Sequence, residues 1–206
     1  MIREFEFFNP FARVTEICTG YLDLGHEEIA GYMRRKLGKH SSYTSYFDKE
    51  FNDRMVAECP QARQMTNAME ATCIMFAKER GVDIDRCGHR EVQLWFSEYL
   101  EGERHTLHNH PRAIVAGTYY PYADEHSCDI RFRHPSSGML QVAEPWTGEN
   151  DGNYQRKNMD SVYKLQPKTG MVNVWPAWME HEIGPQKKVS KEKSRLAISF
   201  NWGRIY

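Results

Sequence analysis

The stretch EVQLWFSEYLEGERHTLHNHPRAIVAGTYYP, residues 91–121, decides the fold class. Short runs rich in Val, Ile, Tyr, Phe and Trp alternate in it with turn residues such as Gly102 and Pro111, and no long helix can be placed. Runs of this kind predict strands over Glu91–Tyr99, His105–His110 and Ala113–Tyr120. The pattern favours a β-sandwich or a β-barrel.

The same pattern continues toward the C-terminus. The sequence EPWTGENDGNYQRK, Glu144–Lys157, interrupts it; this stretch is polar, contains two glycines and is predicted to be a loop. Further strands are predicted over Asp129–Arg133, Ser161–Gln166, Met171–Trp175 and Leu196–Trp202. Many short strands separated by turn residues indicate a mainly β domain.

The N-terminal half carries two predicted helices, Glu27–Lys36 and Gln61–Arg80. The second follows Pro60, ends before Gly81 and has an apolar stripe at steps of three and four, formed by Met65, Met69, Cys73 and Phe76. A methionine stripe of this kind is more typical of core packing than of a binding surface, so this helix is expected to brace a sheet. We expect one domain over 1–206, with N-terminal strands and supporting helices in 1–90 and the β core in 91–206.

Composition excludes several classes of protein. The chain has 27 basic and 28 acidic residues, so it lacks the charge expected of a nucleic-acid or membrane-surface protein. No apolar run is long enough to span a bilayer, and the start, MIREFEFFNPF, has charges where a signal peptide would be apolar. The five cysteines are scattered without a C-x-x-C pair, which favours a reduced, cytoplasmic setting.

Three histidines are candidate metal ligands. His108 and His110 lie two positions apart on a predicted strand, so both imidazoles face the same side. That pattern alone is common, but His181 follows another apolar strand and precedes a Gly-Pro turn, at a predicted barrel rim. Three imidazoles suit Fe, Zn, Cu or Ni. His105 lies three residues before His108, so it is expected to face the opposite side, as a neighbour of the site or a surface residue.

The order of these motifs resembles that of the 2-oxoglutarate/Fe(II)-dependent oxygenases, and most closely their prolyl-hydroxylase-like branch. His-x-His is followed by Tyr119-Tyr120, then by His181, then by Arg195 before an apolar strand, and the resemblance covers about Trp95 to Trp202. It implies a double-stranded β-helix, which is a jelly-roll, cupin-like barrel. It also implies an Fe(II) ion held by His108, His110 and His181, with His110 where the family usually has Asp or Glu.

The resemblance further implies 2-oxoglutarate as cosubstrate and O₂ as co-reactant. Arg195 matches the residue that pairs with the far carboxylate of 2-oxoglutarate, Tyr120 matches a supporting hydroxyl, and Ser199 lies four residues beyond Arg195 on the same strand face. The planar guanidinium fork suits this role because it donates two hydrogen bonds to a carboxylate and stays charged. The usual outcome is hydroxylation, with no catalytic side chain beyond the metal ligands.

The substrate, a small molecule or a peptide, is not identified by the sequence. Trp178, Tyr119 and Arg131 are weak candidates for a substrate pocket, although the aromatic residues fit core packing and Arg131 fits exposed strand charge. Specificity is expected in two loops, His40–Glu58 and Glu144–Lys157. Two alternatives stay open: a cupin-type metalloenzyme with three histidines and no 2-oxoglutarate, and a non-catalytic jelly-roll binding module. A homodimer is also open.

Overall fold

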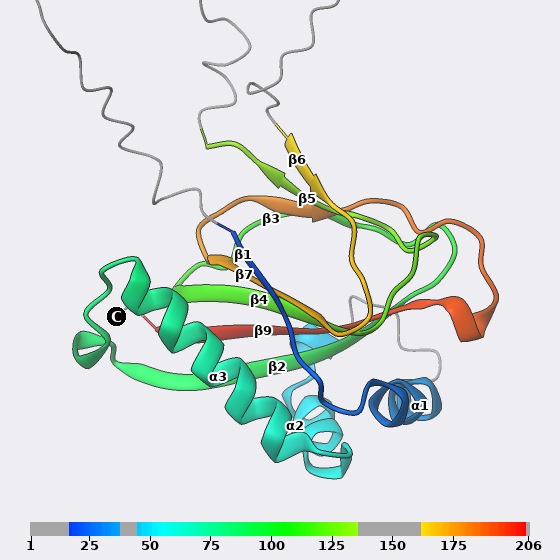
Figure 1. Cartoon of the computed structure of the whole chain (residues 1–206), viewed down its shortest axis with the longest axis horizontal. Coiled ribbons are helices and arrows are strands. Elements are labelled where there is room, and N and C mark those ends of the chain that lie inside the picture. Colours follow the sequence, from blue (N-terminus) through cyan, green and yellow to red (C-terminus); the bar gives the residue numbers. More distant parts are fainter. Residues whose placement is uncertain (1–16, 38–44, 136–161, 205–206) are drawn as a thin grey trace, which may run out of the picture.

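Two antiparallel sheets form the body of the protein. The computed structural model describes residues 17–37, 45–135 and 162–204 (Figure 1). The larger sheet has the strand order β1-β7-β4-β9-β2, with bounds β1 Cys18–Tyr21, β2 His89–Tyr99, β4 Ala113–Tyr122, β7 Met171–Pro176 and β9 Arg195–Arg204. The smaller sheet has the order β3-β8-β5-β6, with bounds β3 His105–His108, β5 Ile130–Arg133, β6 Val162–Leu165 and β8 His181–Ile183.

The chain passes repeatedly between these two sheets. From β2 to β9, only β5 and β6 are consecutive strands of the same sheet, and every pairing is antiparallel. This winding is the double-stranded β-helix, which confirms the predicted jelly-roll fold. The element bounds differ from the prediction by a few residues, and β1 and the three-residue β8 were not predicted as individual strands.

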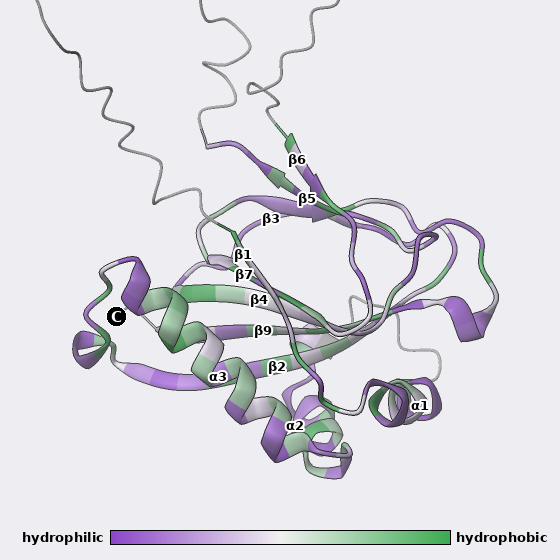
Figure 2. Cartoon of the chain, viewed as in Figure 1, coloured by the Kyte–Doolittle hydropathy of each residue, from purple (hydrophilic) through white to green (hydrophobic). Residues whose placement is uncertain are grey.

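Three helices pack on the outer face of the larger sheet (Figure 1): α1 His26–Leu37, α2 Lys49–Glu58 and α3 Ala62–Glu79. Polar and apolar residues alternate along α3 (Figure 2), and Met65, Met69 and Cys73 are fully buried. The predicted helices correspond to α1 and α3. The prediction of a loop over His40–Glu58 was wrong within 49–58, because Asp48 caps α2 by accepting from the Phe51 backbone N–H.

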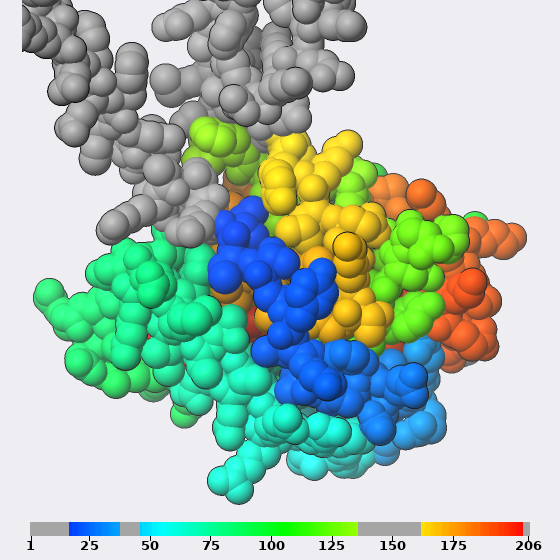
Figure 3. All heavy atoms as spheres, in the orientation of Figure 1, coloured from blue at the N-terminus to red at the C-terminus, as the bar shows by residue number. Residues whose placement is uncertain are grey.

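The larger sheet separates two apolar cores, and β4 contributes to both. Val115 and Tyr119 point toward the helices, whereas Ala116 and Tyr120 point into the barrel. Between them, Gly117 leaves room for the Phe200 ring, because a Cβ there would lie 2.3 Å from that ring. On the surface, the segment with β1 and α1 lies between α3 and β6 (Figure 3). The helices cover one face of this sheet, and the opposite face lines the interior of the barrel.

Candidate metal centre

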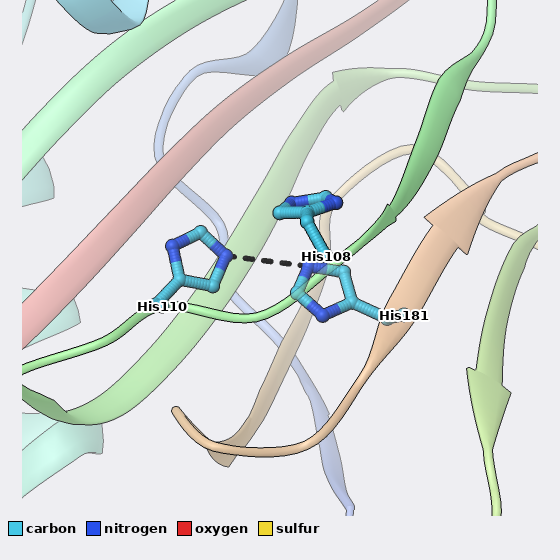
Figure 4. Close-up of side chains that lie close together, drawn as sticks. All are labelled: His108, His110 and His181. Atoms are coloured by element: carbon cyan, nitrogen blue, oxygen red, sulfur yellow. Dashed lines mark hydrogen bonds between the residues drawn. The ribbon is translucent and has the colours of Figure 1, made fainter.

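The side chains of His108, His110 and His181 lie close together (Figure 4). His108 ends β3 and His181 begins β8, and the two residues are directly paired across these strands. His110 follows two residues later in the turn before β4, where its backbone N–H donates to the Ala177 carbonyl at 2.8 Å. One potential ligand nitrogen from each ring lies within 4.8 Å of the others. The sequence-predicted triad is thus brought together.

Hydrogen bonds to the backbone orient two of these rings. The Nδ1–H of His108 donates to the Thr106 carbonyl at 2.8 Å, and the Nδ1–H of His181 donates to the Met179 carbonyl at 3.0 Å. With the proton on Nδ1, the lone pair of each ring is on Nε2. This is the arrangement in which a histidine is held ready to bind a metal.

Burial keeps the triad uncharged. It lowers the pKa of His108, lowers that of His110 to about 3, and lowers that of His181 far below its usual value. For His110 and His181, neighbouring imidazoles contribute to these shifts as a second, smaller cause. The Nε2 atoms of these two rings face each other at 3.3 Å, where two lone pairs would repel unless a proton or a cation lay between them. Three neutral imidazoles at this spacing fit a divalent first-row metal such as Fe(II).

A fourth histidine lies against the triad. The strand register shifts between His105 and His108, and their rings stack with centroids 3.9 Å apart and planes 18° apart. The prediction that His105 faces the opposite side was therefore wrong, because strict alternation fails at such an irregularity. Burial, and to a lesser extent the neighbouring His108 and Arg195, together lower the pKa of His105 to about 4. His105 is thus influenced by both the triad and Arg195.

Arg195 is a buried cation inside the barrel, with 1% of its surface exposed. Its guanidinium lies over the rings of Tyr99 and Tyr120, at 4.5 and 5.0 Å from their centroids, and Nη1 donates to Cys128 Sγ at 3.3 Å. Its Nε and the Tyr120 hydroxyl have no hydrogen-bond partner among the described residues, and no described carboxylate forms a salt bridge with the guanidinium. A buried charge without a counter-ion costs several kcal/mol. The two unsatisfied groups therefore fit a ligand carboxylate.

Four further residues lie around the site, and two of them, Tyr99 and Cys128, were not recognised from the sequence. Tyr99 lies on a predicted strand, but nothing in the sequence indicated that it or Cys128 would contact Arg195. Trp95 lies beside the triad, with its ring centroid 5.6 Å from that of His110. Ser199 shares the barrel face of β9, and its Oγ lies 3.1 Å from Thr118 Oγ1. Whether Ser199 contacts a cosubstrate stays a prediction.

Two of the three predicted pocket residues lie elsewhere. Tyr119 points to the helix side of the sheet, where its hydroxyl lies 2.5 Å from His26 Nδ1. The prediction that Tyr119 lines a substrate pocket was therefore wrong. Arg131 forms ion pairs of 3.0 Å with Asp129 and 3.3 Å with Glu182. It therefore fits the interpretation as a charged residue on the outside of a strand better than that of a pocket residue. Trp178, by contrast, is 41% exposed and lines a cavity together with His110. The predicted loop Glu144–Lys157 lies outside the described residues.

The family of the chain can be assigned by comparison with known proteins. The model of a family described as "Putative 2OG-Fe(II) oxygenase" matches residues 93–201, just over half of the chain. No significant match was found among curated proteins. Among the described residues, no helix combines the length and the hydropathy needed to cross a membrane.

Several solved structures share the fold. A Pseudomonas putida prolyl-4-hydroxylase has a TM-score of 0.59 at 13% identity, covering 95% of this chain and 92% of that chain. A Trichoplax adhaerens prolyl hydroxylase, solved with a peptide fragment of hypoxia inducible factor, has a TM-score of 0.55 at 13% identity, covering 94% and 86%. The non-heme alpha ketoglutarate dependent carbocyclase SnoK from nogalamycin biosynthesis has a TM-score of 0.55 at 9% identity, covering 94% and 81%. At these identities the likeness establishes the fold alone.

Proposed function

The chain belongs to the 2OG-Fe(II) oxygenase family, and from that premise we propose that it is a hydroxylase whose iron is held by His108, His110 and His181. We further propose that Arg195 and Tyr120 bind the distal carboxylate of 2-oxoglutarate. The observation that carries this second assignment is the buried Arg195 guanidinium, which has no carboxylate partner among the described residues. A dicarboxylate cosubstrate supplies the missing charge.

The side chains of this chain contribute positioning rather than proton transfer. Bound iron and 2-oxoglutarate would supply the oxidising chemistry: 2-oxoglutarate would lose CO₂ and take up one oxygen atom of O₂ to become succinate, and the other atom would hydroxylate the substrate. The three neutral imidazoles hold the metal without adding charge of their own. Arg195 and Tyr120, on adjacent strands β9 and β4, fix one end of the cosubstrate. The barrel core around them, including Tyr99 and Ile130, excludes water and so strengthens these charge interactions.

An anaerobic titration tests the assignment. Wild-type protein is titrated with Fe(II), with and without 2-oxoglutarate, and the weak visible charge-transfer band of the chelate is recorded. We expect the band only when both are present. Arg195→Gln should still bind Fe(II), but it should need at least about 100-fold more 2-oxoglutarate, since a partner of a buried ion pair is lost. Arg131→Gln, an arginine outside the barrel interior, is the matched control and should titrate like wild type.

Two results of this titration would contradict the proposal. If iron binds but no band forms in wild type, the 2-oxoglutarate assignment is wrong, and a cupin-type metalloenzyme with three histidines becomes the better description. If iron does not bind, the metal-ligand assignment itself fails.

The substrate class and the compartment of the reaction are part of the proposal. A small molecule or a peptide is the proposed substrate, with O₂ as co-reactant. All five cysteines are free, which supports the proposal of a reducing, cytoplasmic compartment. A non-reducing electrophoresis of protein alkylated in fresh lysate would contradict this location if it revealed disulfide-linked species.

A further inference from the structure

A cavity of about 330 Å³ lies beside the proposed metal site. It is bounded by the C-terminal end of α3, by the turn that carries His110 and by the loop that precedes His181. Its residues come from three segments: Phe76 to Val82, Asn109 to Val115, and Pro176 to Trp178. Since His110 itself lines the cavity, a molecule bound there lies against a proposed iron ligand. The volume suits a small organic molecule.

The cavity is positively charged. Arg80 and Arg112 line it, and none of its lining residues is acidic. Arg80 lies over the Phe76 ring, with its guanidinium carbon 5.3 Å from the ring centroid. Arg112 is exposed and forms no salt bridge with any described residue. An anionic group is therefore the natural partner for this end of a bound molecule.

The backbone holds Arg112 in an unusual position. Its φ angle is +72°, in the left-handed region that residues with a Cβ seldom adopt. The turn is fixed by a hydrogen bond from the Ala113 N–H to the His110 carbonyl at 3.3 Å. Residues held in such strained conformations are concentrated in proteins at functional sites. Here the strained residue lies two positions from a proposed ligand.

The remaining wall is apolar and partly aromatic. Phe76, Val115 and Pro176 contribute to it, and Trp178, a large aromatic residue that is 41% exposed, also lines it. Such a surface favours a planar or aliphatic body. Trp178 also lies three residues before His181, in the loop that leads into β8, and Arg112 lies in the turn that carries His110.

We propose that this cavity binds the substrate, and that the substrate is a small carboxylic acid with an apolar, preferably aromatic, body. Arg112 binds the carboxylate, and Trp178 packs against the body. This inference rests on the proposed function, since it makes the cavity the substrate site of the same iron centre. A second cavity, of about 310 Å³ beside β5 and β6, contains none of the proposed ligands, and its Arg133 lies 3.8 Å from Glu180.

Binding of matched probes tests the charge and the shape of the site. The probes are phenylacetate, indole-3-acetate and 4-phenylbutyrate, each paired with its neutral carboxamide. Calorimetry on metal-free protein gives the ratio of acid to amide affinity, so the result does not depend on catalysis. We expect acids to bind at least about 10-fold more tightly than their amides. The absence of any acid preference across the three pairs overturns the proposal.

Variants identify the residues responsible. Arg112→Gln should bring the ratio of acid to amide affinity close to one, Arg112→Lys should retain part of it, and Trp178→Ala should weaken acid and amide alike. Arg63→Gln, an exposed arginine on α3 outside the cavity, is the matched control and should leave the ratio unchanged. A ratio that survives Arg112→Gln would place the carboxylate elsewhere and refute the assignment.

A paramagnetic measurement tests the position of the cavity relative to the iron site. Mn(II) is added in place of Fe(II), and the longitudinal relaxation of the probe protons is recorded. Enhanced relaxation in wild type that is lost with Arg112→Gln supports a probe bound beside the metal. Acid-selective binding with no enhancement, under conditions where Mn(II) binds, would separate the cavity from the reaction. Failure of Mn(II) to bind counts against the proposed function and leaves the calorimetric result intact.

Discussion

His108 and His181 are paired directly across β3 and β8, and their imidazole centroids lie 4.3 Å apart. The hydrogen-bond register of the smaller sheet therefore fixes the separation of two of the three proposed ligands. Such a site, built on paired strands, is more precise than one built on loops.

Removal of a proposed ligand should abolish metal binding without loss of the fold. His181→Ala and His108→Ala should each bind less than about a tenth of the Fe(II) that wild type binds, because a two-histidine remnant is a poor site. Their metal-free melting temperatures should be close to that of wild type, since each substitution also removes a desolvated imidazole. Metal analysis and thermal melts check both expectations. His126→Ala, an exposed histidine away from the triad, should retain full binding; normal iron content in His181→Ala would contradict the assignment.

Adjacent tyrosines on opposite faces of β4 should respond differently to loss of the hydroxyl. Tyr120→Phe should raise the Kd for 2-oxoglutarate about 10-fold, as a hydrogen bond to a charged group is lost, and leave metal-free stability unchanged, because that hydroxyl has no partner among the described residues. Tyr119→Phe should leave cosubstrate affinity unchanged and lower stability by about 1 kcal/mol, because its hydroxyl contacts His26. Calorimetry and urea unfolding distinguish the pair. Equal effects on 2-oxoglutarate affinity would argue against the assignment of faces.

The stacking of His105 on His108 should matter for metal affinity. His105→Ala removes the ring that supports this proposed ligand and should weaken Co(II) binding about 10-fold, within the range for residues that orient metal ligands. His105→Phe keeps a flat ring and should restore most of the affinity. Competition with a coloured chelator measures both values. If Phe behaves like Ala, ring stacking is not what supports His108.

The metal-free protein should be sensitive to acid. In the folded chain the pKa of His105 is about 4 and that of His110 about 3, whereas an unfolded histidine has a pKa near 6.5. Below pH 6.5 the unfolded chain therefore binds protons that the folded chain does not, so stability is complete above this pH and falls as the pH drops toward 3. Thermal melts of chelator-treated protein from pH 7.5 to 4 should show this decline, and His105→Phe should reduce it. A melting temperature independent of pH in this range would contradict these pKa values.

Gly117 should tolerate no side chain. A Cβ would lie 2.3 Å from the Phe200 ring and 2.8 Å from the Asn173 carbonyl oxygen, and the latter is backbone that cannot move away cheaply. Gly117→Ala should destabilise the protein by about 1–3 kcal/mol, the usual cost of overpacking. Gly20→Ala, where the nearest atom is 3.6 Å away, is the control. Urea unfolding of both variants measures the difference, and equal stability would indicate that the sheet relaxes at Gly117.

The sequence predicted the features that depend on local pattern. Alternating apolar runs indicated most strands, the stripe on residues 61–80 indicated α3, and the motif order placed His108, His181 and Arg195 in one barrel. The errors arose where tertiary structure overrides the pattern. His105 faces the triad because of a register shift. Adjacent residues of a strand face opposite sides, so Tyr119 and Tyr120 face different cores, but the sequence does not tell which of the two faces the barrel interior. Cys128 contacts Arg195 only through the fold.

The uncompensated charge of Arg195 also bears on how long the protein persists in a cell. A ligand that binds only the folded chain shifts the folding equilibrium, by about 2.7 kcal/mol when its concentration is 100 times its Kd. If 2-oxoglutarate neutralises this guanidinium, a fall in the supply of this metabolite leaves a larger fraction of molecules open to proteases. The abundance of the enzyme would then follow the nutritional state of the cell, without a dedicated sensor.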